Sequence, residues 1–336
     1  MKKVNLLING LLGLCCLVSL FSCKENTLEP NATPAKMASM DSKDTHWQSF
    51  NTMEDFTKTM QQLHSYSDKE LAAWEQVQAG FVSWRSNTEN SSDSTITDIP
   101  DAALATVINS QGRIQIADTI YQFVPGEKQR ITYSIPSRYI TDLRNGKTGY
   151  ASWSGVKIND VTMTWLPFPR WEDPERILSP DPNTDICDFP SAFMFPWWGQ
   201  KGGQIYHGDN GSELPRDNGR RVRIEYHRWR VGFLFYSSAG VRVKAWKDTR
   251  FGGWMSTVNM DHVTIKSCIK GIIIIPGLFP QAFHESVNLS ATNTNKLEKT
   301  LKWAATPMHV EVLPEHFNLR FKVNYKGQQI DRFIRE

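Results

Sequence analysis

The spacing of apolar residues changes along the chain, and each change predicts a different kind of segment. Lys2 and Lys3 precede a stretch from Val4 to Leu20 that is almost wholly apolar. A positive start followed by such a run is typical of a secretory signal peptide, and the run is too short for a stable membrane span. No second run of about 18 apolar residues follows, so we expect no other membrane-spanning segment.

A helical period follows within residues 46–118. Apolar side chains recur three and four positions apart at Met53, Phe56, Met60 and Leu63, which predicts an amphipathic helix. A second helix is expected to begin after Ser67, because Glu70 three positions later completes a capping box. We therefore expect an N-terminal helical region over residues 46–118. Its apolar stripe is expected to pack against the rest of the fold, with a partner groove as the alternative.

A period of two dominates residues 119–336, which we expect to form a mainly-β domain. Alternating runs lie at 220–235, 241–245, 262–275 and 317–325, and alternation of this kind predicts half-buried strands. The fold class expected is therefore α+β, mainly β. N-terminal helices precede antiparallel sheets, and a β-sandwich is one arrangement that would bury them.

The first long run changes phase near its middle. Val222, Ile224 and Tyr226 share one face, whereas Trp229 and Val231 fall on the other. A shift of one residue moves every following side chain to the opposite face of a strand. The sequence therefore predicts a bulge or a turn at His227 and Arg228.

An irregular segment, rich in proline and glycine, spans residues 166–219 and contains Trp171, Trp197 and Trp198. Long irregular segments inside a domain are often functional. Indole rings can bury the apolar face of a sugar, so the three tryptophans are candidate ligand-binding residues. The alternative is that they pin the loop to the core.

The end of the first apolar stretch, Leu20-Phe21-Ser22-Cys23, resembles the signal of bacterial lipoproteins. The resemblance implies a signal peptide over residues 1–22, a lipid on Cys23, and anchoring at the outer membrane or cell surface. Residues 23–45 are expected to form a flexible tether, because Ser, Thr, Asn, Pro and charged residues dominate after Cys23 and no apolar period occurs. Lys24-Glu25 is loosely similar to the surface-export signal of Bacteroidetes lipoproteins. The run from Leu104 to Phe123 resembles uncharacterised lipoproteins of Bacteroidetes, and this second resemblance implies no activity.

Five cysteines occur in the chain. Cys15 and Cys16 belong to the expected signal peptide, and Cys23 is the expected lipid site. Cys187 and Cys268 remain in an exported and therefore oxidising environment, where a disulfide between them is a candidate. Two separate buried thiols are the alternative.

Basic residues concentrate in the C-terminal third of the chain. A basic strip on paired strands could grip phosphate or sulfate groups, and its candidate ligand-binding residues are Arg221, Arg223, Arg228 and Arg230. A soluble sheet face that resists edge pairing is the alternative. Nucleic acid is not expected as a partner of an exported protein.

Common catalytic and metal signatures are missing from the sequence. His284-Glu285-Ser286-Val287-Asn288 lacks the second histidine of the zinc-protease helix, so that zinc site is rejected. Asp181, Asn183, Asp185 and Asp188 resemble a calcium loop, but Ile186 stands where such a loop needs glycine. No catalytic residue, metal or other cofactor is expected, with calcium as the alternative.

These observations favour a lipid-anchored envelope or surface protein that binds a ligand without turnover, namely a glycan or an anionic envelope component. One alternative is a carbohydrate-active hydrolase, which would need two carboxylates facing each other across a cleft. The other is a structural subunit of an envelope assembly, which would bind a protein partner.

Overall fold

The computed structural model of the chain describes residues 46–90, 99–124, 130–141, 160–163, 170–171, 177–178, 186–187, 199–248, 256–307 and 310–334. They all belong to one compact unit, Ser42–Glu336. Cys23, Trp197, Trp198, the signal peptide, the tether and the acidic residues of the candidate calcium loop lie outside the described residues. The backbone of Trp171 is described, but its side chain is not.

Four helices are described in the N-terminal part: α1 (Met53–Leu63), α2 (Asp68–Gln76), α3 (Trp84–Asn90) and α4 (Ala102–Val107). Thr52 caps α1 by accepting a hydrogen bond from the Asp55 backbone N–H. The capping box expected at Ser67 and Glu70 is confirmed at the start of α2. Phe56, Met60 and Leu63 are buried, as their helical spacing predicts.

The first sheet has five strands in the order β1-β2-β3-β4-β5. Their bounds are β1 (Ser49–Phe50), β2 (Arg113–Ile116), β3 (Thr119–Val124), β4 (Arg130–Pro136) and β5 (Asp160–Met163), and a 3-10 turn, η1 (Ser137–Tyr139), follows β4. We expected the helical region to end at residue 118 and the mainly-β domain to begin at residue 119. The hairpin of β2 and β3 spans this boundary. Together with α1–α4, this sheet forms what we call the N-terminal module.

Asn109 fixes the entry to that hairpin. Its side-chain oxygen accepts hydrogen bonds from the backbone N–H groups of Gln111 and Arg113, and its amide donates to the carbonyl of His46. Gly112 in this turn has φ of +82°, and a Cβ there would lie 2.3 Å from the carbonyl oxygen of Phe123. Only glycine fits such a close approach with positive φ.

Two further sheets contain the C-terminal strands. The second has the order β11-β10-β9-β8-β6, with β14 also paired to β10, and the third has the order β13-β12-β15-β16-β7. The second sheet is built from β6 (Arg170–Trp171), β8 (Gly199–Ile205), β9 (Val222–Phe233), β10 (Tyr236–Lys247), β11 (Ser256–Thr257) and β14 (Lys296–Ala305). The third is built from β7 (Ile177–Leu178), β12 (Met260–Ile274), β13 (Gln281–Thr294), β15 (Glu311–Tyr325) and β16 (Gln328–Ile334).

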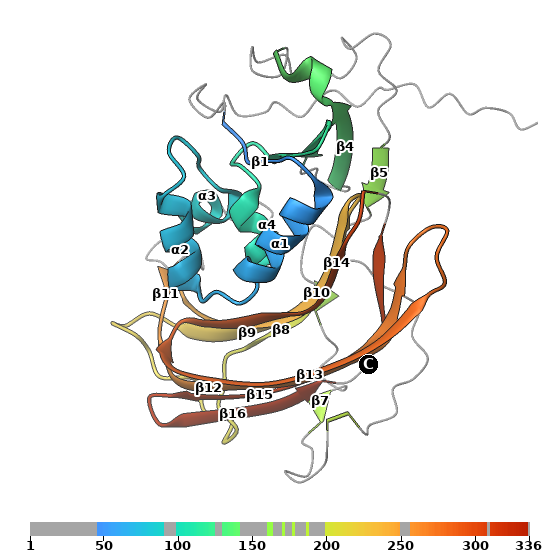
Figure 1. The fold of residues 1–336 in the computed structure, drawn as a ribbon. Coiled ribbons are helices and arrows are strands. Elements are labelled where there is room, and N and C mark those ends of the chain that lie inside the picture. Colours follow the sequence, from blue (N-terminus) through green and yellow to red (C-terminus); the bar gives the residue numbers. More distant parts are fainter. Residues whose placement is uncertain are drawn as a thin grey trace, which may run out of the picture. The chain divides into compact units, whose positions relative to one another are not determined.

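The second and third sheets face each other across one apolar core and form a β-sandwich (Figure 1). Side chains from β9 and β10 meet side chains from β12, β15 and β16, including Tyr226, whose ring lies 5.0 Å from that of Phe321. The chain crosses between the sheets at Asn295, because β13 pairs with β12 and β14 pairs with β10. The expected α+β, mainly-β fold class is confirmed.

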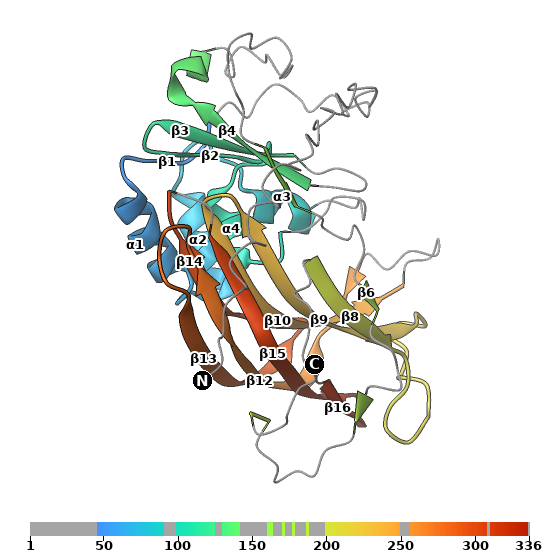
Figure 2. The ribbon, with the colours of Figure 1, turned by 90° about the vertical axis from the view of Figure 1, so that its right-hand side faces the viewer.

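The N-terminal module packs on the other side of the second sheet, away from the third (Figures 1 and 2). The second core contains Trp229, Val231 and Phe233 of β9 together with buried residues of α1, α4, β2 and β3. Gly240, opposite Trp229 on β10, makes room for the indole, since a Cβ there would lie 2.2 Å from Trp229 Cζ2.

The prediction of a bulge or a turn at His227 and Arg228 is wrong. β9 runs without interruption from Val222 to Phe233, and its pairing with β10 shows no register shift. The apolar pattern changes phase because the strand serves two cores. Its first half buries one face in the sandwich, and its second half buries the opposite face under the N-terminal module.

The expected exposed basic strip on β9 is also corrected, because Arg228 and Arg230 are buried, with 0% and 1% of their surface exposed. Both point between the two sheets of the sandwich. Arg228 Nη1 donates to the carbonyl of Phe317 at 2.6 Å, and Arg230 Nε donates to that of Val312 at 2.8 Å. The pKa of Arg230 is lowered to about 10. Burial is the cause, and the nearby carboxylate of Glu311 opposes part of its effect.

Replacing Arg228 should therefore affect stability. We expect Arg228→Ala to lower the free energy of unfolding by about 2–4 kcal/mol, because it leaves a cavity and removes a donor to a buried carbonyl. Urea denaturation followed by tryptophan fluorescence measures the change. Arg221→Ala is the matched control, since Arg221 is 51% exposed and pairs with Asp248; it should cost less than about 1 kcal/mol. Equal, small effects of both variants would contradict the buried position of Arg228.

Candidate functional site: the polar half of the second sheet

The outer face of the second sheet, which points away from the third sheet, has two unlike halves. Where β9 carries Trp229, Val231 and Phe233, the N-terminal module covers the face. Towards the start of β9, the same face carries polar and charged residues instead. We call this half the polar face; its residues are Gln200, Gln204, Arg223, Glu225, His227, Arg242, Lys244, Trp246, Lys296 and Glu298.

The strand register brings these residues together in rows. Gln204, Glu225, Lys244 and Lys296 are successive partners across β8, β9, β10 and β14. Directly paired residues point to the same face of a sheet, and alternate residues along a strand do so too. The polar face is therefore a continuous surface that spans four strands.

Glu225 is the centre of one ionic group on this face. One of its carboxylate oxygens lies 3.1 Å from His227 Nε2, and the other accepts a hydrogen bond from Arg223 Nη2 at 3.0 Å. Burial alone would raise the pKa of Glu225, but His227, Arg223 and Arg242 together lower it to about 2. The carboxylate is therefore ionised at any physiological pH.

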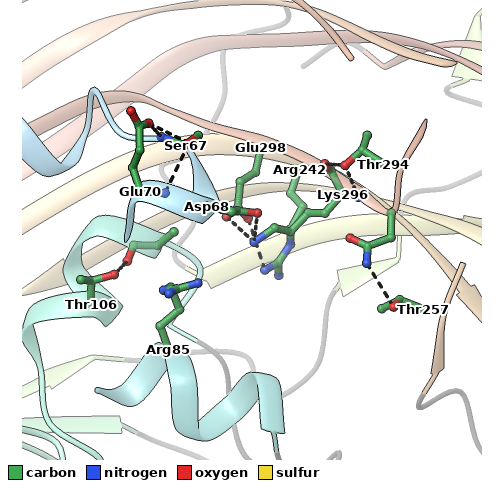
Figure 3. A network of polar contacts seen from close by, with 12 residues as sticks. Ser67, Asp68, Glu70, Arg85, Thr106, Arg242, Thr257, Thr294, Lys296 and Glu298 are labelled. Carbon is green, nitrogen blue, oxygen red and sulfur yellow. Dashed lines mark hydrogen bonds and ion pairs between the residues drawn. The ribbon is translucent and has the colours of Figure 1, made fainter. Parts of the chain in front are cut away.

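Glu298 is the centre of a second group. Its carboxylate lies 2.8 Å from Lys296 Nζ and 3.8 Å from Arg242 Nη1. Lys296 also pairs with Asp68 of α2 at 3.1 Å, which ties this group to the N-terminal module. Figure 3 shows Asp68 beside Lys296, Glu298 and Arg242. Arginine or lysine side chains therefore contact both carboxylates of the polar face.

Trp246 adds an aromatic ring next to Arg223, its partner across the β9–β10 pair. The ammonium of Lys244 lies 3.9 Å from the ring centroid, which is cation–π geometry. Among the described residues, the indole Nε1 of Trp246 is buried and has no hydrogen-bond partner. A buried donor without a partner costs free energy.

The residues expected to bind ligand are thus placed differently from one another. Arg223 belongs to the polar face, whereas Arg228 and Arg230 lie between the sheets. Trp171 in β6 pairs with Gly202, which places its backbone in the same row as His227, Arg242 and Glu298. Trp197 and Trp198 lie outside the described residues.

Sequence reasoning missed Trp246, Glu225 and Glu298. The signal available was the alternation of β9 itself, in which Arg223, Glu225 and His227 occupy the face that later carries Trp229. The partners of these residues on β10 and β14 could not be assigned, because the sequence of one strand does not determine its register with a distant strand.

Cys187 and Cys268 are joined by a disulfide, with their Cα atoms 5.4 Å apart. His284, the first residue of the rejected zinc-protease motif, lies on strand β13 and not on a helix. Its Nε2 is 3.3 Å from Cys268 Sγ. This group lies on the third sheet and is separate from the polar face.

In comparisons with known proteins, no protein-family model, no curated protein and no solved structure matches the chain.

The ionic group around Glu225 makes stability depend on acid pH. Its lowered pKa gives stabilisation that is fully present above pH 4.5 and is lost as the pH falls towards 2. We expect Glu225→Gln to lower the unfolding free energy by up to about 3 kcal/mol at pH 7, at about 1.4 kcal/mol per pKa unit. The difference from wild type should shrink between pH 4.5 and 2.

Thermal or urea unfolding across this pH range measures the difference. Glu213→Gln is the control, because Glu213 is 49% exposed and lies 4.0 Å from Arg216, and such pairs contribute little. A Glu225→Gln effect that is the same at pH 2.5 and pH 7 would show that the carboxylate charge is not what stabilises the fold.

Proposed function

We propose that the chain is an exported lipoprotein, anchored through an acylated Cys23, whose polar face binds a glycan without chemical turnover. The observation that carries the proposal is the pairing of charges beside Trp246. Arginine, glutamate, glutamine and histidine side chains held in one orientation offer fixed donors and acceptors for hydroxyl groups. The ring of Trp246, with the ammonium of Lys244 beside it, adds an apolar surface.

A glycan with few charges fits this surface better than a polyanion. Cations on the polar face already contact carboxylates of the protein: Arg223 contacts Glu225, and Lys296 contacts Glu298 and Asp68. A phosphate or sulfate would have to displace those carboxylates and leave them without partners, which is costly where they are partly buried. Hydroxyl groups could bond to the same side chains without breaking the ion pairs.

The hydrolase alternative has less support at this face. Glu225 and Glu298 lie on β9 and β14, with β10 between them. Two strand spacings of about 4.8 Å and an offset of two residues, about 6.8 Å along the strand, separate their backbones by roughly 12 Å. Glycosidase carboxyl groups lie about 5–9.5 Å apart, and one must hold a proton. Glu225, with a pKa of about 2, cannot do so at neutral pH.

The anchor rests on the sequence of the N-terminal segment. Among the described residues, no helix is both long and apolar enough to cross a bilayer. Acylation with several chains would hold the protein durably at a membrane, whereas one chain alone would hold it only marginally.

Binding can be tested on an array of neutral and anionic glycans, read at about 0.05 and 0.5 M salt. We expect a neutral glycan to bind at both salt concentrations, since only exposed charge contacts are strongly screened. Trp246→Ala should weaken that binding at least tenfold, which corresponds to about 1.4 kcal/mol. The control is Phe279→Ala, because Phe279 is an aromatic residue that is 93% exposed and lies off the polar face.

Salt-sensitive binding to anionic glycans, unchanged in Trp246→Ala, would move the site to a basic surface elsewhere. No binding on the array, together with a co-purifying envelope protein, would favour the assembly-subunit alternative.

Cys23→Ser tests the anchor. We expect the wild-type N-terminal peptide to begin at Cys23 and to carry acyl chains, as measured by mass spectrometry. The variant should lose that mass and leave the membrane fraction, because the thiol that accepts the lipid is gone. Cys16→Ser is the matched control, since it removes a thiol from the expected signal peptide and should leave anchoring intact. A mature wild-type chain that begins elsewhere would disprove this part of the proposal.

A further inference from the structure

Three metal-binding side chains meet on the outer face of the third sheet. The ligand atoms offered by Cys187, Cys268 and His284 all lie within 4.8 Å of one another. Cys268 is on β12 and His284 is on the neighbouring β13, where it pairs with Lys270. Cys187 comes from a distant part of the chain and lies over the sheet. In the structure the two sulfurs are bonded to each other, so the thiolates needed for a metal are not formed.

Two contacts hold Cys187 in place independently of the disulfide. Lys270 Nζ donates to the carbonyl oxygen of Cys187 at 3.2 Å. Asn318 Nδ2 donates to the carbonyl oxygen of Ile186 at 2.8 Å. Asn318 is also the partner of Cys268 across β12 and β15. Neither bond involves a sulfur atom, so both can form when the disulfide is reduced.

We propose that the reduced protein binds one Zn²⁺ through the thiolates of Cys187 and Cys268 and the imidazole of His284. The disulfide is then the oxidised, metal-free form of the same site. A dithiol reductant supplies two electrons and two protons, which break the S–S bond and form two thiols. Zn²⁺ displaces both thiol protons when it binds, and the reductant becomes a disulfide.

The donor set suits zinc. Two thiolates and one imidazole match the usual ligands of Zn²⁺, with Zn–S of about 2.3 Å and Zn–N of about 2.0–2.1 Å. Sulfur and nitrogen ligands exclude the hard cations Ca²⁺ and Mg²⁺.

Three protein ligands leave the fourth position of a tetrahedral zinc site open to water. Asn318 is 2% exposed, and its Oδ1 has no hydrogen-bond partner among the described residues. A zinc-bound water could donate to this oxygen. An unpaired buried acceptor next to Cys268 is therefore a second observation in favour of a ligand at this place.

The test uses the full chain, reduced with a phosphine that is then removed, and Co²⁺ as a spectroscopic probe. We expect one Co²⁺ per chain, with a thiolate-to-cobalt charge-transfer band that Zn²⁺ abolishes. The oxidised chain should show no such band. Competition with a chromophoric chelator should show that His284→Ala weakens Zn²⁺ binding at least tenfold, as expected for loss of a ligand.

His262→Ala is the matched control, since His262 lies on the same face of β12 and contacts Thr264 and Ser290 instead of a cysteine. It should bind Zn²⁺ as tightly as wild type. Circular dichroism of the reduced, metal-free chain checks that the sheet persists. The proposal is overturned if the reduced chain unfolds, if it binds no Co²⁺ at one equivalent, or if His284→Ala binds Zn²⁺ unchanged.

Discussion

The structure depends on one constraint: the apolar side chains of β9 lie on opposite faces in its two halves, and each set must be buried. Val222, Ile224 and Tyr226 face the sandwich core, while Trp229 and Val231 face the N-terminal module. An antiparallel sheet with one solvated face would need only one apolar face. Here the module covers what would otherwise be an apolar patch containing a fully buried tryptophan, so sandwich and module are expected to fold as one cooperative unit.

That constraint also explains the polar network between module and sheet. The Tyr236 hydroxyl donates to Asp101 Oδ2 at 2.5 Å, and His64 Nε2 lies 2.9 Å from the same hydroxyl. Asp101 also caps α4 through the backbone N–H of Leu104. Burial, followed by Asp101, raises the pKa of Tyr236 well above its ordinary value. A satisfied buried network of this kind fixes one orientation of the module, which apolar contacts alone would specify less strictly.

Local features of the fold could be predicted from the sequence, and pairings between distant segments could not. The capping box at Ser67 depends on residues three positions apart, so the sequence contains all of it. The phase change in β9 was visible, but a bulge and a second core produce the same pattern. Only the presence of the module on the far side distinguishes them. Likewise, the sequence does not distinguish Arg228 from Arg223. Alternate residues of β9 point to opposite faces, and only the position of the third sheet shows that Arg228 is on the buried face and Arg223 on the polar face.

The positions of the two candidate sites follow from the same geometry. The inner faces of both sandwich sheets are used by the core, and the module uses half of one outer face. Two surfaces remain that can hold polar side chains in fixed orientations: the other half of that face, and the outer face of the third sheet. Because β13 and β14 are consecutive strands in different sheets, His284 and Glu298 lie on one continuous stretch of chain. A change at the cysteine pair thus has a covalent route to the polar face, but coupling between them would require two distinct arrangements of that stretch.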